Sequence, residues 1–227
     1  MTAQSTGRTS SSLLGRIFGV AADPQTYKNS LYLLVRFPLG IAYLIVFVTL
    51  LSLGVSLVPL LIGVPILAGV LSVAGYVGVV EAALLRTLLG RDIVWTPTNP
   101  NDTPVVPYLK QVATDPHNYL LLLLAFVSFA TGNVLFVGLV VWFALSFSFV
   151  IAPAAYRFDN VQYFTASGPV ELGIVSVSEE QLVIDTVPEA LLVSLLGIVT
   201  TVIGLHLVNL TTQVYADITE SLLSTSE

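Results

Sequence analysis

The sequence predicts an all-α membrane protein with four transmembrane helices, built as two tandem helical hairpins. A small extracytoplasmic β-rich insert is expected between the third and fourth helices. The composition is that of a membrane protein, with 55% apolar residues, 10% charged residues and a mean hydropathy of +0.90. The second observation is that uncharged runs exceed the length of a core helix, since residues 37–80 contain 44 residues without a charge.

The first hairpin is expected over residues 23–90. At 1.5 Å per residue, a single helix of 44 residues would be about 66 Å long, whereas the hydrocarbon core of a bilayer is about 30 Å thick. Pro59, Gly63 and Pro65 interrupt the run near its middle, and these residue types favour turns and helix ends. The pattern therefore predicts two spans joined by a tight apolar turn.

The ends of this hairpin have recognisable signals. Residues 1–22 are rich in Ser and Thr and are expected to form a flexible or amphipathic N-terminal tail. Asp23 and Pro24 follow the pattern of a helix cap and a first helical turn. Gly90 is typical of a residue that ends a helix.

A connector and the second hairpin follow. Residues 91–118 contain five prolines, which we interpret as excluding a regular helix and indicating an extended connector. The second hairpin is expected over residues 119–216, and its first helix is expected from about Tyr119 to Ile151. A re-entrant pair split at residues 131–133 is the alternative, but its first half would be too short to span.

Residues 154–188 change character and form the expected insert. Three β-prone pieces, at residues 161–165, 170–177 and 182–186, are separated by turn residues. The last span comes after them. Residues 217–227 are expected to form a C-terminal tail that continues as a polar helix or frays.

The basic residues predict the orientation. With four spans, seven of the eight Lys and Arg residues fall on one side, namely Arg8, Arg16, Lys28, Arg36, Arg86, Arg91 and Lys110. Arg157 falls on the other side. Because basic residues are enriched in cytoplasmic loops, both termini and the 91–118 connector of this multi-pass cell-membrane protein are expected to be cytoplasmic.

An internal repeat relates the two hairpins. The sequence Asp-Pro-Gln-Thr-Tyr at residues 23–27 recurs as Asp-Pro-His-Asn-Tyr at residues 115–119, an offset of 92. On the same offset, Phe-Pro-Leu-Gly at residues 37–40 meets Phe-Ala-Thr-Gly at residues 129–132. Because both hairpins would begin and end in the cytoplasm, the repeats are expected to be parallel, unlike the inverted repeats of many transporters.

The two halves of the repeat differ in length. Residues 82–90 align with residues 216–224 at an offset of 134. The change of offset from 92 to 134 places an insertion of 42 residues in the second hairpin, which corresponds to the region of the expected insert.

Charged residues inside the spans are the strongest site candidates, because a charge is expensive in lipid. Arg36 and Glu81 differ in depth by about five residues, or about 7.5 Å, a gap that an Arg side chain can nearly close. We therefore expect an ion pair between the first two helices at the inner interface. The aligned positions are Ser128 and Tyr215, so both charges are absent there together. Alternatively, each side chain reaches water separately.

Two further sets of residues are candidate contact sites. A polar seam is expected on one face of the last helix, at His206, Asn209 and Gln213, facing Asn133 or Tyr76. Such a seam would form hydrogen bonds between helices or, through His206, sense pH or a ligand. A helix-packing face is expected where small residues recur in the second span, at Ala74, Gly78 and Ala82.

Several stretches together resemble a known family. They are Thr-Tyr-Lys-Asn-Ser-Leu-Tyr-Leu-Leu-Val-Arg-Phe-Pro-Leu-Gly at 26–40, the turn at 59–65, the segment 81–90 and Asp-Thr-Val-Pro-Glu-Ala at 185–190. They look like the "putative sensor" transmembrane domain, which precedes some bacterial histidine kinases and occurs alone in salt-loving archaea. The resemblance covers most of residues 23–224. It implies a sensor domain without established ligand or catalytic residues. Since the sequence ends at Glu227 without a kinase module, output is expected through a separate protein.

Patterns of catalysis and metal binding are absent. The chain has no Cys and two His, and it lacks a His-Glu-x-x-His motif, a phosphate-binding loop and a nucleophile elbow. We therefore expect no catalytic residue, cofactor, metal or nucleic-acid partner. The expected partners are the lipid bilayer and a signalling protein, a membrane complex or a second copy of the chain.

The favoured function is a non-enzymatic membrane sensor or regulator. It would pass an extracytoplasmic or membrane signal to a separate cytoplasmic partner. One alternative is a structural or accessory subunit of a larger membrane complex. The other alternative is a small channel or transporter.

Overall fold

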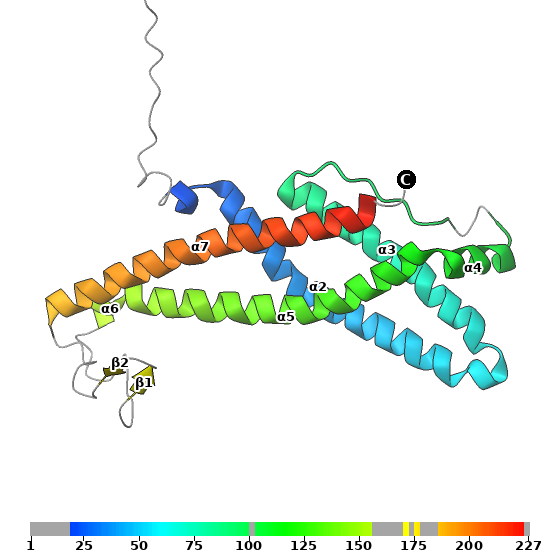
Figure 1. Cartoon of the computed structure of the whole chain (residues 1–227), viewed down its shortest axis with the longest axis horizontal. Helices are drawn as coiled ribbons and strands as arrows, with labels where there is room; N and C mark the ends of the chain where they lie inside the picture. Colours follow the sequence, from blue (N-terminus) through cyan, green and yellow to red (C-terminus); the bar gives the residue numbers. More distant parts are fainter. Residues whose placement is uncertain (1–18, 100–102, 156–169, 173–174, 178–185, 225–227) are drawn as a thin grey trace, which may run out of the picture. The chain divides into compact units, whose positions relative to one another are not determined.

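The structure is a computed structural model, and it describes residues 19–99, 103–155, 170–172, 175–177 and 186–224. Within these residues, four helices are long and apolar enough to cross a membrane (Figure 1). They are α2 (Pro24–Ser56), α3 (Gly63–Leu89), α5 (Pro116–Val150) and α7 (Val187–Ser224). The shorter elements are η1 (Gly19–Ala21), η2 (Val58–Leu60), α4 (Val105–Thr114), α6 (Ala152–Ala155), β1 (Val170–Leu172) and β2 (Val175–Val177).

The expected all-α core is consistent with this structure, but the expected β-rich insert is wrong. In the described part of residues 154–188, strand structure is limited to β1 and β2, two strands of three residues that pair antiparallel. The stretch 170–177 was expected to be one β-prone piece, and instead two short strands within it pair with each other. Two strands this short cannot form the hydrophobic face of a sheet. The pieces at 161–165 and 182–185 lie outside the described residues, as does most of the expected 1–22 tail.

The described residues divide into two packed units. The first contains residues 19–138 and 206–224, and the second contains the described residues of 139–205, so that α5 and α7 pass through both. In the second unit, glycines bring α5 and α7 together. A Cβ on Gly197 would lie 2.6 Å from the backbone nitrogen of Val150. The indole of Trp142 covers Gly204 and donates to the carbonyl oxygen of Thr200 at 3.0 Å.

Helix α5 is one continuous element of 35 residues. The alternative of a re-entrant pair split at residues 131–133 therefore does not hold. Helix α7 also continues to Ser224, so the described part of the expected 217–227 tail is helical.

The first hairpin begins and ends with the expected caps. The carboxylate of Asp23 accepts the backbone N–H of Gln25 at 2.9 Å, and Pro24 is the first residue of α2. An N-cap carboxylate satisfies a backbone donor that has no partner within the helix. Gly90 caps α3 in the left-handed region, with φ of 67°. Both ends follow the local sequence signals.

The turn between α2 and α3 uses its residues differently from the sequence expectation. Leu61, and not a glycine, adopts the left-handed conformation, with φ of 61°. Gly63 is needed for a close approach instead, because a Cβ there would overlap the backbones of Gly54 and Val58. The turn therefore depends on contact between the two helix ends.

The connector at 91–118 contains a helix, so the expectation that its prolines exclude one is wrong. Pro104 is the N-cap of α4, and Pro107 lies in its first turn. Proline is tolerated there because the first backbone N–H groups of a helix have no partner within it. Pro116 is likewise the first residue of α5.

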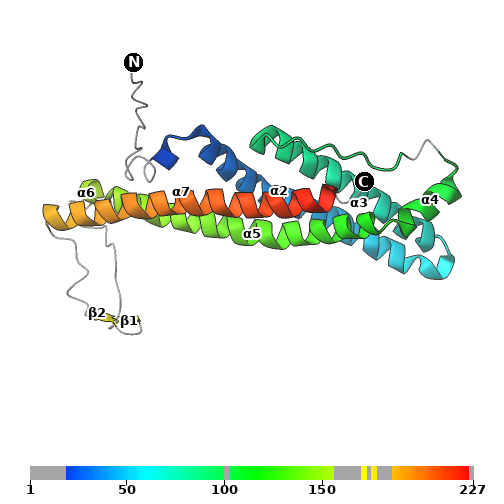
Figure 2. The ribbon, with the colours of Figure 1, turned by 45° about the horizontal axis from the view of Figure 1, so that its top comes forward.

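The connector runs back along α3 (Figures 1 and 2). The indole N–H of Trp95 donates to the carbonyl oxygen of Gly75 at 2.8 Å, and the indole covers Gly78. Further along, the hydroxyls of Tyr108 and Ser72 form a hydrogen bond. Successive connector residues therefore contact successively earlier turns of α3.

As a result, α2 begins beside the end of α3, whereas α5 begins farther toward the turn, beside Gly75 in the middle of α3. At the start of α2, the side chain of Gln25 donates to the carbonyl oxygen of Leu88 at 3.2 Å, near the end of α3. At the start of α5, Tyr119 lines a cavity with Leu51 and Leu67, which lie near the turn. In the expected parallel arrangement, the connector would return to Leu88 and α5 would begin there, beside the start of α2.

Aromatic contacts give the direction of α5. The rings of Phe37 and Phe136 stack with centroids 4.2 Å apart, and those of Phe47 and Phe126 are 6.4 Å apart. Residue numbers therefore rise along α2 as they fall along α5, and these helices are antiparallel. The expected parallel arrangement of the two repeats is wrong. Antiparallel spans begin at opposite faces of a membrane, so this arrangement does not support the prediction that both termini and the 91–118 connector lie on one cytoplasmic side.

The contacts where α2 and α5 cross agree with the antiparallel direction of these two helices. A Cβ on Gly40 would lie 2.6 Å from the Cα of Phe129, and one on Gly132 would lie 3.2 Å from the backbone nitrogen of Phe37. An offset of 92 converts each contact into the other. Such reciprocal contacts are typical of elements related by a two-fold axis. Two parallel helices could not exchange these contacts.

The starts of α2 and α5 repeat the same local structure. The carboxylates of Asp23 and Asp115 each accept a backbone N–H two residues later at 2.9 Å. The hydroxyls of Tyr27 and Tyr119 each donate to a carbonyl oxygen six residues earlier at 2.8 Å. Both sets of contacts are related by the offset of 92.

Replacing Gly40 with Ala should destabilise the protein by about 1–3 kcal/mol, because the new methyl group would push α2 away from the backbone of α5. Gly138→Ala on α5 is the matched control, since a Cβ there meets nothing within 4 Å. It should change the free energy of unfolding by less than about 1 kcal/mol. Unfolding in mixed detergent micelles measures both, and equal effects would contradict the close crossing.

The antiparallel arrangement predicts which positions can be cross-linked. The natural chain has no Cys, so introduced pairs react uniquely. A short bis-maleimide should link Leu67→Cys to Tyr119→Cys, which line one cavity. It should not link Arg86→Cys to Tyr119→Cys. Cross-linking of the Arg86→Cys pair, without cross-linking of the Leu67→Cys pair, would contradict the antiparallel arrangement and support the parallel one.

Candidate functional site

A buried ion pair lies between α2 and α3. The Nη2 atom of Arg36 lies 2.8 Å from Oε2 of Glu81, and Nη1 donates to Oε1 at a longer 3.4 Å. Both side chains are 0% exposed. The structure thus brings together the two charges that the sequence placed at different depths. Enclosed charges of this kind require pairing and hydrogen bonds.

Residues of all four long helices surround the guanidinium. Nη2 of Arg36 also donates to the hydroxyl of Tyr32, one turn earlier on α2. Nη1 donates to Oγ of Ser128 on α5 at 3.4 Å. The ring of Tyr215 on α7 lies 3.6 Å from the guanidinium carbon, as a cation–π contact. Arg36 therefore contacts a side chain from each of the other three long helices.

Two buried donors near this pair have no hydrogen-bond partner among the described residues. They are Nε of Arg36 and the hydroxyl of Tyr43. Tyr43 lies seven residues after Arg36 and hence on the same face of α2. Buried donors without a partner are rare in folded proteins and energetically costly.

Sequence reasoning did not anticipate the roles of Ser128 and Tyr215. They are the repeat equivalents of Arg36 and Glu81, and they were identified as positions that lack the charges. Both bind each other through their hydroxyls at 3.0 Å and contact Arg36. The alignment with Arg36 and Glu81 was a signal in the sequence, but it gave no information on which aligned positions lie in contact.

The expected polar seam is not one continuous site. The side-chain oxygen of Asn209 accepts from Asn29 at 2.8 Å, and its nitrogen donates to Thr26 at 3.0 Å. Asn209 therefore bonds α2 and not the third span. Asn133 donates to a carbonyl oxygen of its own helix. His206 and Gln213 are exposed.

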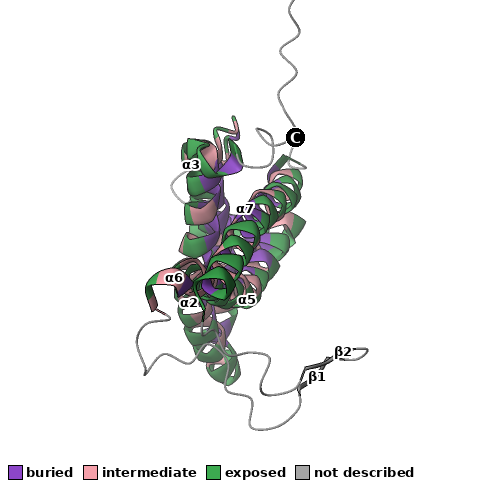
Figure 3. Cartoon of the chain, turned by 90° about the vertical axis from the view of Figure 1, so that its left-hand side faces the viewer, coloured by how far each residue is buried: buried purple, intermediate pink, exposed green. Residues whose placement is uncertain are grey.

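The expected packing face at Ala74, Gly78 and Ala82 is buried, and Figure 3 shows buried residues along α3. At Gly78 it receives the indole of Trp95 from the connector, and not another long helix. Gly78 precedes Glu81 by three residues, which makes the two positions neighbours on α3. The connector is therefore seated beside the ion pair.

An ion-pair cluster joins Arg91, which follows α3, to the last turns of α7. Arg91 bonds the carboxylate of Glu220 and lies 2.6 Å from that of Asp217. The hydrogen bond to Glu220 is the main cause that raises the pKa of the Arg91 guanidinium above its usual value. Partly exposed pairs like these contribute little stability individually.

A polar cavity of about 460 Å³ lies between the connector and the start of α5. Its lining includes Trp95, Thr96, Asp115 and His117. One oxygen of Asp115 accepts the backbone N–H of His117 and also lies 3.2 Å from Nδ1 of its ring. Among the described residues, no group of three or more His, Asp or Glu side chains is arranged to hold a metal ion.

Removing either charge alone should be costly, because the other would be left buried without a partner. Arg36→Met and Glu81→Leu should each lower the free energy of unfolding by about 3–5 kcal/mol. The double variant should lose clearly less than the sum, since no charge remains unpaired. Detergent unfolding measures this cycle. Additive losses would show that the two residues do not interact.

A family model described as "Putative sensor" matches residues 32–223, a span that includes Arg36, Glu81, Ser128 and Tyr215. Comparison with curated proteins finds no match, and comparison with solved structures finds none. Together with the four long apolar helices, the family match indicates a multi-pass membrane protein. Since the match covers most of its length, the chain belongs to the family described as "Putative sensor".

Proposed function

We propose that the protein is a non-enzymatic membrane sensor or regulator that passes a membrane or extracytoplasmic signal to a separate cytoplasmic partner. The observation that supports this proposal most is the enclosure of Arg36, which bonds or stacks on side chains from all three other long helices. A displacement of any span would alter the surroundings of this one charge. Charged residues inside a membrane are expensive and usually functional.

A sensor needs two states of comparable free energy. The unused donors of Arg36 and Tyr43 support a second arrangement, because a shift of α3 could exchange hydrogen bonds within the cluster without leaving a charge unpaired. Electrostatic interactions are strong where water is excluded, so small displacements have large energies there. A stimulus would act by favouring one arrangement of the spans.

The connector is the proposed output. Trp95 is seated on Gly78, which neighbours Glu81 on α3. Movement of α3 at the ion pair would therefore displace Gly78, the residue on which Trp95 of the connector packs. Close to the end of α3, the connector also presents the exposed apolar side chain of Val94 to a partner.

The test compares the natural chain with the Arg36→Met, Glu81→Leu double variant in liposomes. A Cys introduced at the exposed Val94 reports the state of the connector through its maleimide labelling rate. Across steps of salt concentration and lipid composition, the rate should change at least threefold in the natural background and stay constant in the double variant. Lys28→Cys, exposed at the start of α2, is the control position.

A labelling rate that is constant under all conditions in the natural background would contradict sensing. Purification in mild detergent then tests the alternative that the protein is an accessory subunit of a membrane complex. A membrane complex of fixed stoichiometry, unaffected by the double variant, would identify an accessory subunit.

A small transporter is the second candidate. Inverted repeats with polar residues at their interface support it, since many transporters bind substrate at such positions. Against it, Arg36 and Glu81 are 0% exposed. Ion or solute flux into liposomes that is lost in the double variant would favour transport.

A further inference from the structure

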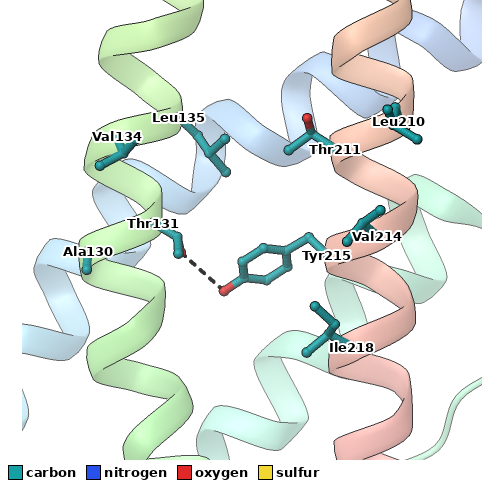
Figure 4. A pocket seen from close by; sticks show the side chains of 9 residues that line it. All are labelled: Ala130, Thr131, Val134, Leu135, Leu210, Thr211, Val214, Tyr215 and Ile218. Atoms are coloured by element: carbon teal, nitrogen blue, oxygen red, sulfur yellow. Dashed lines mark hydrogen bonds between the residues drawn. The ribbon is translucent and has the colours of Figure 1, made fainter.

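An apolar groove of about 530 Å³ lies between α5 and α7 in the first unit (Figure 4). Its nine lining residues are Ala130, Thr131, Val134, Leu135, Leu210, Thr211, Val214, Tyr215 and Ile218. None of them is charged. Positions 210–218 extend for about 12 Å along α7, so the groove follows the helix axis.

The polar atoms that face the groove from Thr131 and Tyr215 already have partners. The hydroxyl of Thr131 donates to the carbonyl oxygen of Val127 at 2.8 Å. The hydroxyl of Tyr215 bonds that of Ser128 at 3.0 Å and lies 3.5 Å from that of Thr131. A polar ligand would find few unpaired groups, so the groove selects for an apolar occupant.

The surroundings of the groove identify that occupant. Both helices are long and apolar enough to cross a membrane, and a groove on the outer surface of two spans would face the hydrocarbon of the bilayer. Its rim side chains are strongly exposed, with Val134 at 72% and Leu210 at 58%. We propose that this groove binds the hydrocarbon chain of a membrane lipid, and that the occupied groove holds Tyr215 against Arg36.

Tyr215 connects the groove to the ion pair. Figure 4 shows its side chain extending from α7 toward Thr131 on α5. The same ring lies 3.6 Å from the guanidinium carbon of Arg36. A chain in the groove limits the movement of the ring and preserves this contact. The coupling step rests on the proposed sensing function, whereas binding in the groove does not.

Binding is tested with a phosphatidylcholine that carries a diazirine in its acyl chain. The full-length protein is reconstituted with this lipid and irradiated, and cross-linked residues are identified by mass spectrometry. Cross-links at Val134, Leu210 and Val214 should exceed those at Leu207 and Val137 at least threefold. Those two control residues are exposed on the same helices outside the groove.

Filling the groove provides the matched comparison. Ala130→Phe places a ring in the groove and should reduce the groove cross-links at least threefold, whereas Val137→Phe should leave them unchanged. Circular dichroism and gel filtration establish that both variants fold. Equal cross-linking at groove and control positions would overturn the proposal, since it would indicate bulk lipid contact only. Protection of the groove by a second protein chain would also overturn it.

The labelling assay at Val94→Cys separates this proposal from the proposed function. If Ala130→Phe loses groove cross-links and also the labelling response, both binding and coupling are supported. Normal groove cross-links with a constant labelling rate in the natural background would leave lipid binding supported and contradict sensing. A labelling response that persists in Ala130→Phe would overturn the coupling step.

Discussion

Enclosing Arg36 is the constraint on which the arrangement of the first unit depends. A guanidinium with no exposed surface in an apolar region needs a counter-charge and further polar contacts. The neighbours on α2 and α3 cannot supply all of these contacts, because they leave much of the planar guanidinium uncovered. Ser128 and Tyr215 provide the remaining contacts from α5 and α7. The glycines at 40 and 132 allow α5 to approach closely enough for this.

The two hairpins contribute unequally to this enclosure, and the predicted repeat would make the asymmetry necessary. Arg36 contacts Ser128, which is its own equivalent in the second hairpin. If both repeats carried Arg at this position, two guanidinium groups would face each other with little water between them. Like charges at such a separation repel strongly in a medium of low dielectric constant. A position that contacts its own aligned position can hold a charge in one hairpin only, which accounts for Ser128 opposite Arg36.

Much of each hairpin was predictable because it depends on local signals. Asp23, Pro24 and Gly90 fix helix ends through backbone hydrogen bonds and conformation, and uncharged length defines the spans. The pairing of Arg36 with Glu81 could be expected from depth within one hairpin. By contrast, the direction of the second hairpin depends on contacts far apart in sequence, such as Trp95 on Gly78. The number of charged residues on each side gives no information on such packing. The number of prolines in the connector did not predict α4, because proline is tolerated in the first turn of a helix.

Placing both charges in the first hairpin affects how the chain enters a membrane during synthesis. Residues 24–89 leave the ribosome before α5 exists, so Arg36 and Glu81 arrive together and can neutralise each other at once. An unpaired Arg or Asp at the centre of a span costs about 2.5–3.5 kcal/mol on insertion scales. In the described part of the second hairpin, the charged residues lie toward the ends of α7, so the hairpin inserts without this penalty. The first hairpin can therefore act as the template against which Ser128 and Tyr215 later dock.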